Sequence, residues 1–196
     1  MIAAIVLAAG TSSRMGKPKQ TLPVSGKPML ERVIDVYRNS NVDAVFVVLG
    51  ANAAYVRRGV RFHKEKVVMN PLYKKGMSGS LRLGLRAAKR EADAVIVALG
   101  DQPFLSSGTV NRMIEVYSKT KAPVVVPVYR GVRGNPVLFD SSLFPEIMQI
   151  RGDKGAKSVV QRHQDGLKEV AVEDRGILVD IDTPSDYLKA SRTRKG

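Results

Sequence analysis

The chain has 196 residues, 44% of them hydrophobic, and a formal net charge of +14 from 32 Lys and Arg residues against 18 Asp and Glu residues. A chain of this size can bury the core of one domain. Because it has no cysteine, disulfides, thiolate metal sites and cysteine nucleophiles are excluded. The positive charge favours polyanionic partners, including nucleotide triphosphates, nucleic acid and anionic membranes, without choosing among them.

Short apolar segments are the first pattern along the chain. The N-terminal one resembles the apolar core of a signal peptide, yet no Lys or Arg precedes it and it continues directly into a glycine-containing loop. No apolar run approaches the roughly 18 to 20 residues that a membrane-spanning helix needs, so we expect a cytoplasmic protein with no membrane partner. The Val- and Ile-rich segments predict buried strands at residues 2–8, 44–49, 67–69, 94–99 and 124–128.

Helical patterns alternate with these predicted strands. Apolar residues recur at helical spacing in residues 110–117 and 156–163, and Pro28 suits the first turn of a helix over the following residues. Thr183 and Asp186 stand at the two positions of a capping box, which predicts the start of a last helix. The alternation predicts one α/β domain, residues 1–196, with a mostly parallel sheet and helices on both faces. A small insertion is expected at about 130–151, where "NPVLF" suggests an extra strand.

The loop "LAAGTSSRMGKPKQ", residues 7–20, follows the first strand and has the composition of a phosphate-binding loop. Gly10 and Gly16 are separated by five residues, and a proline replaces the hydroxyl that a Walker loop needs, which excludes that motif. Two glycines are too few for a dinucleotide-binding motif. Small residues that expose backbone amides, together with the cations Arg14 and Lys19, still favour phosphate binding over an ordinary turn.

Three further polar stretches follow predicted strands or extended segments, where such a sheet collects its ligands. Asp101 in "LGDQP" suits a magnesium carboxylate, or alternatively an Asx turn. Residues 70–85 place small residues around a base or ribose, or only start a helix with Ser78 as its cap. In "VDIDTPSDY", we expect only one of Asp180 and Asp182 to face the site and the other to be solvated.

Together these residues describe one kind of chemistry. Phosphate-binding cations, a metal carboxylate and the lack of a covalent nucleophile favour in-line attack on a phosphate, catalysed by positioning and charge neutralisation. Neither histidine lies in a motif: His163 is on a helical apolar stripe and His63 in a charged segment, so we expect both to be structural.

The same segments resemble the MobA/MocA-like nucleotidyltransferases, which use a "LAAGxSxRMGxxK" loop, and within them the molybdenum-cofactor cytidylyltransferase group. The resemblance runs through "LAAGTSSRMGKPKQTLPVSGKPML", "NPLYKKGMSGSLRLGL", "GDQPFL", "RGNPVLF", "GDKGAKSVV" and "DIDTP", in this order. It implies a three-layer, Rossmann-like α/β fold and transfer of a nucleotidyl group from an NTP to a phosphorylated acceptor, with release of pyrophosphate.

The resemblance also implies roles for individual residues. Arg14, Lys19 and Asp101 would be catalytic, and Asp101 and Asp182 would hold Mg²⁺. The nucleotide would be bound by Leu7, Ala8, Ala9, Gly10, Thr11, Ser12, Gly16, Gly76, Met77 and Ser78. The acceptor would be bound by Gly134, Asn135, Gly152, Asp153, Lys154 and Gly155.

Two positions bear on the substrates. Ala9 gives "LAAG", whereas guanylyltransferase relatives usually show "LAGG"; this favours CTP over GTP, by about 1–3 kcal/mol at most for one methyl group. Asn135 stands where relatives often carry histidine, which leaves the acceptor open. The leading hypothesis is Mg²⁺-dependent transfer of CMP from CTP to molybdopterin.

Three alternatives remain at this stage. One is a guanylyltransferase, or a nucleotidyltransferase for a sugar phosphate or another small phosphate. A second is an accessory protein that delivers cofactor to a molybdoenzyme. The third, a nucleic-acid binder, is disfavoured because the cations are scattered and lack interleaved aromatic residues.

Overall fold

The computed structural model describes residues 1–153 and 155–192, so Lys154, expected near the acceptor, lies outside the described residues. Within this part of the chain the core is an eight-stranded sheet. Seven of its strands follow the order β10-β7-β9-β6-β1-β4-β5, and the eighth, β8, pairs with β7 outside this order. The strands are β1 Ile2–Ala8, β4 Ala44–Leu49, β5 Lys66–Met69, β6 Ala94–Leu99, β7 Val124–Tyr129, β8 Val132–Arg133, β9 Val137–Asp140 and β10 Leu167–Ala171.

The sheet is mostly parallel, as predicted. Strand β1 lies at its centre, with Ile5 opposite Phe46 of β4 and Val97 of β6, and both pairings are parallel. The extra strand suggested by "NPVLF" exists as β9, which runs antiparallel between β6 and β7. Strand β10 was not predicted, because in "LKEVA" only Val170 is buried and an edge strand of this kind has a weak apolar signal.

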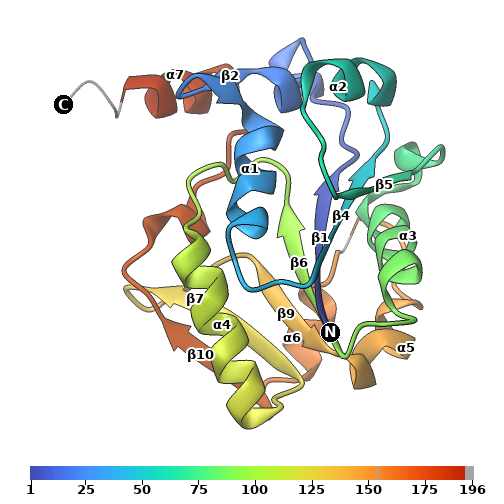
Figure 1. The fold of residues 1–196 in the computed structure, drawn as a ribbon, viewed down its shortest axis with the longest axis vertical. Coiled ribbons are helices and arrows are strands. Elements are labelled where there is room, and N and C mark those ends of the chain that lie inside the picture. Colours follow the sequence, from blue (N-terminus) through green and yellow to red (C-terminus); the bar gives the residue numbers. More distant parts are fainter. Residues whose placement is uncertain (154, 193–196) are drawn as a thin grey trace.

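Helices cover both faces of the sheet, which confirms the three-layer α/β fold (Figure 1). Alternate residues of β1 point to opposite faces, so Val6 packs in the cluster that contains α1 and α4 and Ile5 in the cluster that contains α3. Burying one such side chain stabilises the fold by about 1.5–3 kcal/mol. The helices are α1 Met29–Arg38, α2 Ala53–Gly59, α3 Met77–Ala88, α4 Ser107–Thr120, α5 Phe144–Ile147, α6 Lys157–Arg162 and α7 Pro184–Arg192.

The start of α7 agrees with the sequence prediction, and the start of α1 differs from it. The predicted capping box is present before α7: the Thr183 backbone N–H donates to Asp186 Oδ2 (2.9 Å), and the Asp186 N–H donates to Thr183 Oγ1 (3.2 Å). Pro28 does not lie in the first turn of α1. It precedes that helix in the small hairpin of β2 (Pro23–Val24) and β3 (Lys27–Pro28), because its extended backbone pairs with Pro23.

The carboxyl ends of the central strands lie at one edge of the sheet. Strands β6, β1, β4 and β5 are parallel neighbours, so the loops that follow them gather at one edge (Figure 1). Among the described residues, no helix is long and apolar enough to cross a membrane.

Candidate active site

The loop after β1 is shaped by a buried glutamine that the sequence did not single out. Gln20 is 3% exposed, and its Nε2 donates to the carbonyl oxygens of Ala8 (3.2 Å) and Gly10 (3.3 Å). Ser12 adopts a left-handed backbone conformation, and its Oγ donates to Gln20 Oε1 and accepts from the Lys19 N–H. These hydrogen bonds from the buried Gln20 and from Ser12 fix the shape of the loop and the position of the Lys19 backbone.

Lys19 joins two carboxylates that are distant in sequence. Its Nζ lies 2.7 Å from Asp101 Oδ2 and 2.6 Å from Asp182 Oδ1, and the more exposed Arg14 reaches Asp182 Oδ2 at 3.1 Å. Burial alone would lower the pKa of Lys19, but the two carboxylates outweigh it and hold that pKa above its usual range. Burial would raise the pKa of Asp182, but Lys19 and Arg14 lower it below its usual range. Both groups are therefore charged near neutral pH.

A backbone contact brings these carboxylates together. Asp101 follows β6, where the Gly100 N–H donates to the Leu7 carbonyl (2.9 Å); a Cβ on Gly100 would lie 2.9 Å from the Ala8 Cβ, so only glycine permits this approach. The Ile181 N–H donates to the Asp101 carbonyl (3.0 Å), which places the "DIDTP" segment beside the strand tip.

Asp182 is the aspartate of that segment that contacts Lys19, whereas Asp180 contacts Gln102. The carboxylate of Asp180 accepts a 2.6 Å hydrogen bond from Gln102 Nε2. Burial, with the negative charges of Asp101 and Asp182, raises the pKa of Asp180. This residue was expected to be solvated; it is exposed as a whole, yet its carboxylate is bonded to the buried Gln102.

The carboxylates fit a divalent cation. Asp101 Oδ1 is buried and has no hydrogen-bond partner among the described residues, which is costly for a carboxylate oxygen unless a ligand completes it. No group of three or more metal-binding side chains is present in the described part of the chain. Two carboxylates with phosphate oxygens as further ligands are the usual protein site for Mg²⁺, so this donor set fits that ion.

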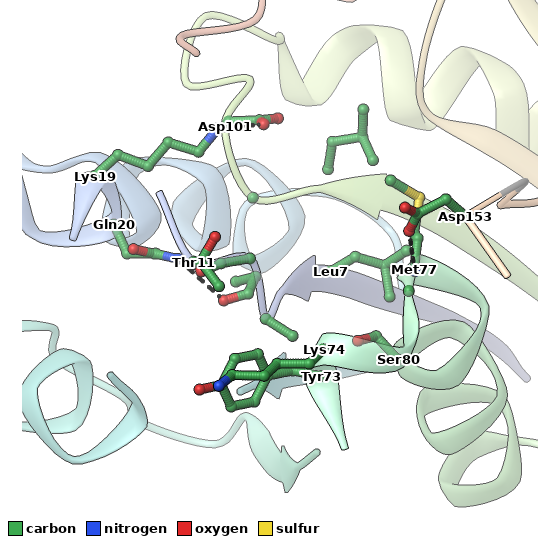
Figure 2. Close-up of a pocket in the computed structure, with 16 residues that line it drawn as sticks. Leu7, Thr11, Lys19, Gln20, Tyr73, Lys74, Met77, Ser80, Asp101 and Asp153 are labelled. Atoms are coloured by element: carbon green, nitrogen blue, oxygen red, sulfur yellow. Dashed lines mark hydrogen bonds and ion pairs between the residues drawn. The ribbon is translucent and has the colours of Figure 1, made fainter. Parts of the chain in front are cut away.

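A cavity of about 350 Å³ opens beside Lys19 and Asp101. Figure 2 shows these two residues on one side, Tyr73 and Ser80 on another, and Met77 with Asp153 at the end. Of the expected nucleotide-binding residues, seven line it: Leu7, Ala8, Ala9, Gly10, Thr11, Gly76 and Met77. The lining also includes Ser80, from the stretch expected around a base or ribose, and Asp153, which was expected at the acceptor. The lining residues that we did not predict are Gln20, Tyr73, Lys74, Leu99 and Gly100.

Three residues expected at the nucleotide, Ser12, Gly16 and Ser78, do not line this cavity. Ser12 instead stabilises the loop through its hydrogen bonds with Gln20 and Lys19. Ser78 is 1% exposed and is not the cap of α3, because the helix begins one residue earlier. The first helical N–H, that of Met77, instead donates to Asp153 Oδ1 (2.9 Å), a cap that comes from a distant loop and has no local sequence pattern.

A second cavity, of about 680 Å³, adjoins the first, since both are lined by Leu7, Leu99, Met77 and Asp153. Four expected acceptor residues line it: Gly134, Asn135, Asp153 and Gly155. Gly152 does not, although its carbonyl accepts from the Ser78 N–H (3.2 Å). The rest of the lining is an apolar floor of Val97, Val126, Val137, Ala156 and Val160 with a polar rim of Arg133, Lys157, Gln161 and Gln164.

Neither histidine takes part in these cavities. His163 Nε2 lies 2.7 Å from Glu146 Oε2, and the His63 N–H donates to Glu65 Oε2 (2.6 Å). The His163 contact joins the end of α6 to α5, whereas the His63 contact is made by the backbone within one loop.

Comparison with known proteins assigns the family. Residues 4–167 match the model of the MobA-like NTP transferase domain. The chain belongs to this family. It is 31% identical to the purine catabolism protein PucB of Bacillus subtilis, over 93% of this chain and 92% of that protein. Nicotine blue oxidoreductase of Paenarthrobacter nicotinovorans is 29% identical (93% and 92%), and the molybdenum cofactor cytidylyltransferase of Escherichia coli is 27% identical (95% and 93%).

Solved structures agree with this assignment. Rv0371c of Mycobacterium tuberculosis, in a complex with manganese, superposes with a TM-score of 0.84 at 32% identity, with 98% of each chain covered. A nucleotidyl transferase from Methanothermobacter (Mth528) gives 0.83 at 29% identity, covering 98% of this chain and 97% of that one. The chain is thus a nucleotidyltransferase of the MobA-like family, a class of enzymes that commonly uses a divalent metal ion.

Proposed function

We propose that this nucleotidyltransferase transfers CMP from CTP to molybdopterin with Mg²⁺ and releases pyrophosphate. One observation carries the proposal: Lys19, Asp101 and Asp182 form a charged cluster beside a small cavity that adjoins a larger, mainly apolar one. The small cavity suits a nucleotide, and the larger one suits an acceptor that must reach the α-phosphate.

The nucleotide would lie along the loop after β1. Residues 7–11 bring backbone amides to the cavity, and the exposed Arg14 is free to turn from Asp182 towards a triphosphate. Ala9, which lines the cavity, supports CTP because guanylyltransferase relatives usually have glycine at this position.

Transfer requires only positioning and charge neutralisation. A phosphate oxygen of the acceptor attacks the α-phosphorus of CTP; a new P–O bond forms as the bond to the β-phosphate oxygen breaks, and pyrophosphate leaves. Lys19 and Arg14 would neutralise the charge that develops on the phosphates. Asp101 and Asp182 would hold Mg²⁺, which when bound neutralises further charge on the triphosphate.

The acceptor cavity supports molybdopterin by its chemistry. A flat pterin can lie on the valine floor, the side chains of Asn135, Gln161 and Gln164 offer donors and acceptors to its polar edge, and Lys157 offers a cation to its phosphate. The likeness to the Escherichia coli molybdenum cofactor cytidylyltransferase over nearly the whole chain gives further support.

The first test is a thermal-shift series with CTP, GTP, ATP and UTP in the presence of Mg²⁺. A ligand that binds only the folded protein raises its melting temperature according to its affinity, and we expect the largest rise with CTP. Purified protein should then release pyrophosphate from CTP only when molybdopterin and Mg²⁺ are both present. A rise with GTP and none with CTP would show that the base is wrongly assigned.

A second candidate is a nucleotidyltransferase for another acceptor, such as a sugar phosphate or a small phosphorylated acid, or a guanylyltransferase. Asn135 favours it, because this residue lines the acceptor cavity at the position where relatives often have histidine. The names of the PucB and nicotine blue oxidoreductase relatives also point to processes other than cofactor synthesis. Pyrophosphate release measured with a panel of phosphorylated acceptors separates the two candidates.

A further inference from the structure

Lys19 occupies the space between the two carboxylates that the proposed function gives to the metal ion. Its ammonium bonds Asp101 Oδ2 and Asp182 Oδ1, and Arg14 covers Asp182 Oδ2. Three of the four carboxylate oxygens are therefore paired with cations, and the fourth, Asp101 Oδ1, is buried without a hydrogen-bond partner among the described residues. A divalent cation that joins these carboxylates would lie next to an ammonium of the same sign, which Coulomb repulsion opposes.

The Lys19 side chain can leave this position without unfolding the loop. Its backbone N–H is held by Ser12 Oγ (3.2 Å), and the neighbouring Gln20 anchors the loop to the end of β1. Only the flexible four-carbon stem has to turn. Lys19 also lines the nucleotide cavity, so a triphosphate bound there offers phosphate oxygens to the same ammonium.

We propose that Lys19 is a resident cation that the metal ion replaces: its ammonium bridges Asp101 and Asp182 in the nucleotide-free protein and moves to the triphosphate when nucleotide enters. The carboxylates are then free for the divalent ion. Lys19 thereby couples the two binding events, because metal binds weakly to the free protein and strongly beside the nucleotide. This inference rests on the metal site of the proposed function.

The test uses Mn²⁺ alone as the probe and no nucleotide, with affinity measured from the EPR signal of the free ion. Lys19→Met removes the competing ammonium. We expect it to bind Mn²⁺ about fivefold or more tightly than the wild-type protein, the lower end of ordinary coupling between sites. Lys17→Met is the matched control: it removes the same charge two residues away, from an exposed side chain with no ion pair among the described residues, and should leave the affinity unchanged.

Melting temperature provides a second measurement. Lys19→Met leaves both carboxylates without their shared cation, so Mn²⁺ should raise its melting temperature more than that of the wild-type protein or of Lys17→Met. If Lys19→Met does not fold, Lys19→Gln, which keeps a hydrogen-bond donor without the charge, is used for both measurements.

Two different results separate the inference from the proposed function. Mn²⁺ affinity in the Lys19 variant equal to that of wild type would overturn the exchange. Adding Asp101→Asn to the Lys19 variant should abolish the gain in affinity. If the double variant keeps that gain, the metal does not bind at Asp101, and the proposed metal site itself is wrong.

Discussion

The two adjoining cavities differ in how they are built. The cavity proposed for the nucleotide is small, and its walls are joined by ion pairs and buried hydrogen bonds that involve Lys19, Asp101 and Gln20. The cavity proposed for the acceptor has about twice the volume, a floor of valine side chains and a rim of amides and exposed cations. Under the proposed function, phosphate chemistry is set on one side and acceptor choice on the other. Substitutions in the two cavities should therefore produce different kinetic and thermodynamic effects.

The largest effect is expected on the nucleotide side. Asp101→Asn removes a charge that holds both Lys19 and the proposed metal ion, so kcat for pyrophosphate release should fall by about 100- to 1,000-fold, with every acceptor that the enzyme accepts. Steady-state kinetics measure the loss, and thermal unfolding checks that the fold survives. A variant that keeps full turnover would contradict the catalytic role and leave a delivery function open.

The next effect compares two glutamines, one in each cavity. Gln20→Leu leaves the Ala8 and Gly10 carbonyls without their buried donor, which should cost about 1–3 kcal/mol. At about 2–4 °C per kcal/mol for a chain of this size, the melting temperature should fall measurably. The KM for the nucleotide should rise with it.

Gln161→Leu is the matched control, because it makes the same change at an exposed side chain of the acceptor cavity. It should leave the melting temperature unchanged and alter only the KM for the acceptor. Equal loss of stability in both variants would remove the distinction between the two sides.

A smaller effect is expected for Asn135→Ala. Loss of one hydrogen bond to the acceptor should raise its KM by about two- to tenfold and leave the KM for the nucleotide unchanged. Initial rates measured while each substrate is varied in turn give both constants. A change only in the KM for the nucleotide would contradict the proposal that Asn135 contacts the acceptor.

The smallest effect is a pH dependence confined to the charged side. Lys19 and Arg14 hold the pKa of Asp182 below its usual range, so this carboxylate contributes stability above its unfolded pKa of about 3.9 and loses it as pH falls through the folded value. The difference in melting temperature between wild type and Asp182→Asn should therefore shrink below about pH 4. Asn135→Ala, whose amide does not titrate, should show a difference from wild type without this dependence.

Much of the fold was predictable because local patterns carry it. The strands at residues 2–8, 44–49 and 94–99 were predicted to the residue, since two buried faces require uninterrupted apolar runs. The edge strand β10 and the short helix α2 were missed, because mostly exposed elements need few apolar residues. Their formation depends on neighbours that are distant in sequence.

The residues of the candidate site also divide into those that the sequence predicts and those that it does not. Arg14, Lys19 and Asp101 could be named from the sequence because each stands in a distinctive motif beyond a strand end. Gln20 and Tyr73, and the part that Asp153 plays in both cavities, could not, because their partners lie on other segments and no spacing along the chain records them.

The sequence alone determined which residue types stand at the carboxyl edge of the sheet, since uninterrupted apolar runs and glycine-containing loops are local properties of a chain. Only the tertiary structure decided that Lys19 bridges carboxylates 82 and 163 residues away, and that the cavities proposed for nucleotide and acceptor share lining residues. Those facts depend on strand order and on how closely loops pack, which are settled by the burial of the whole core and not by any one segment.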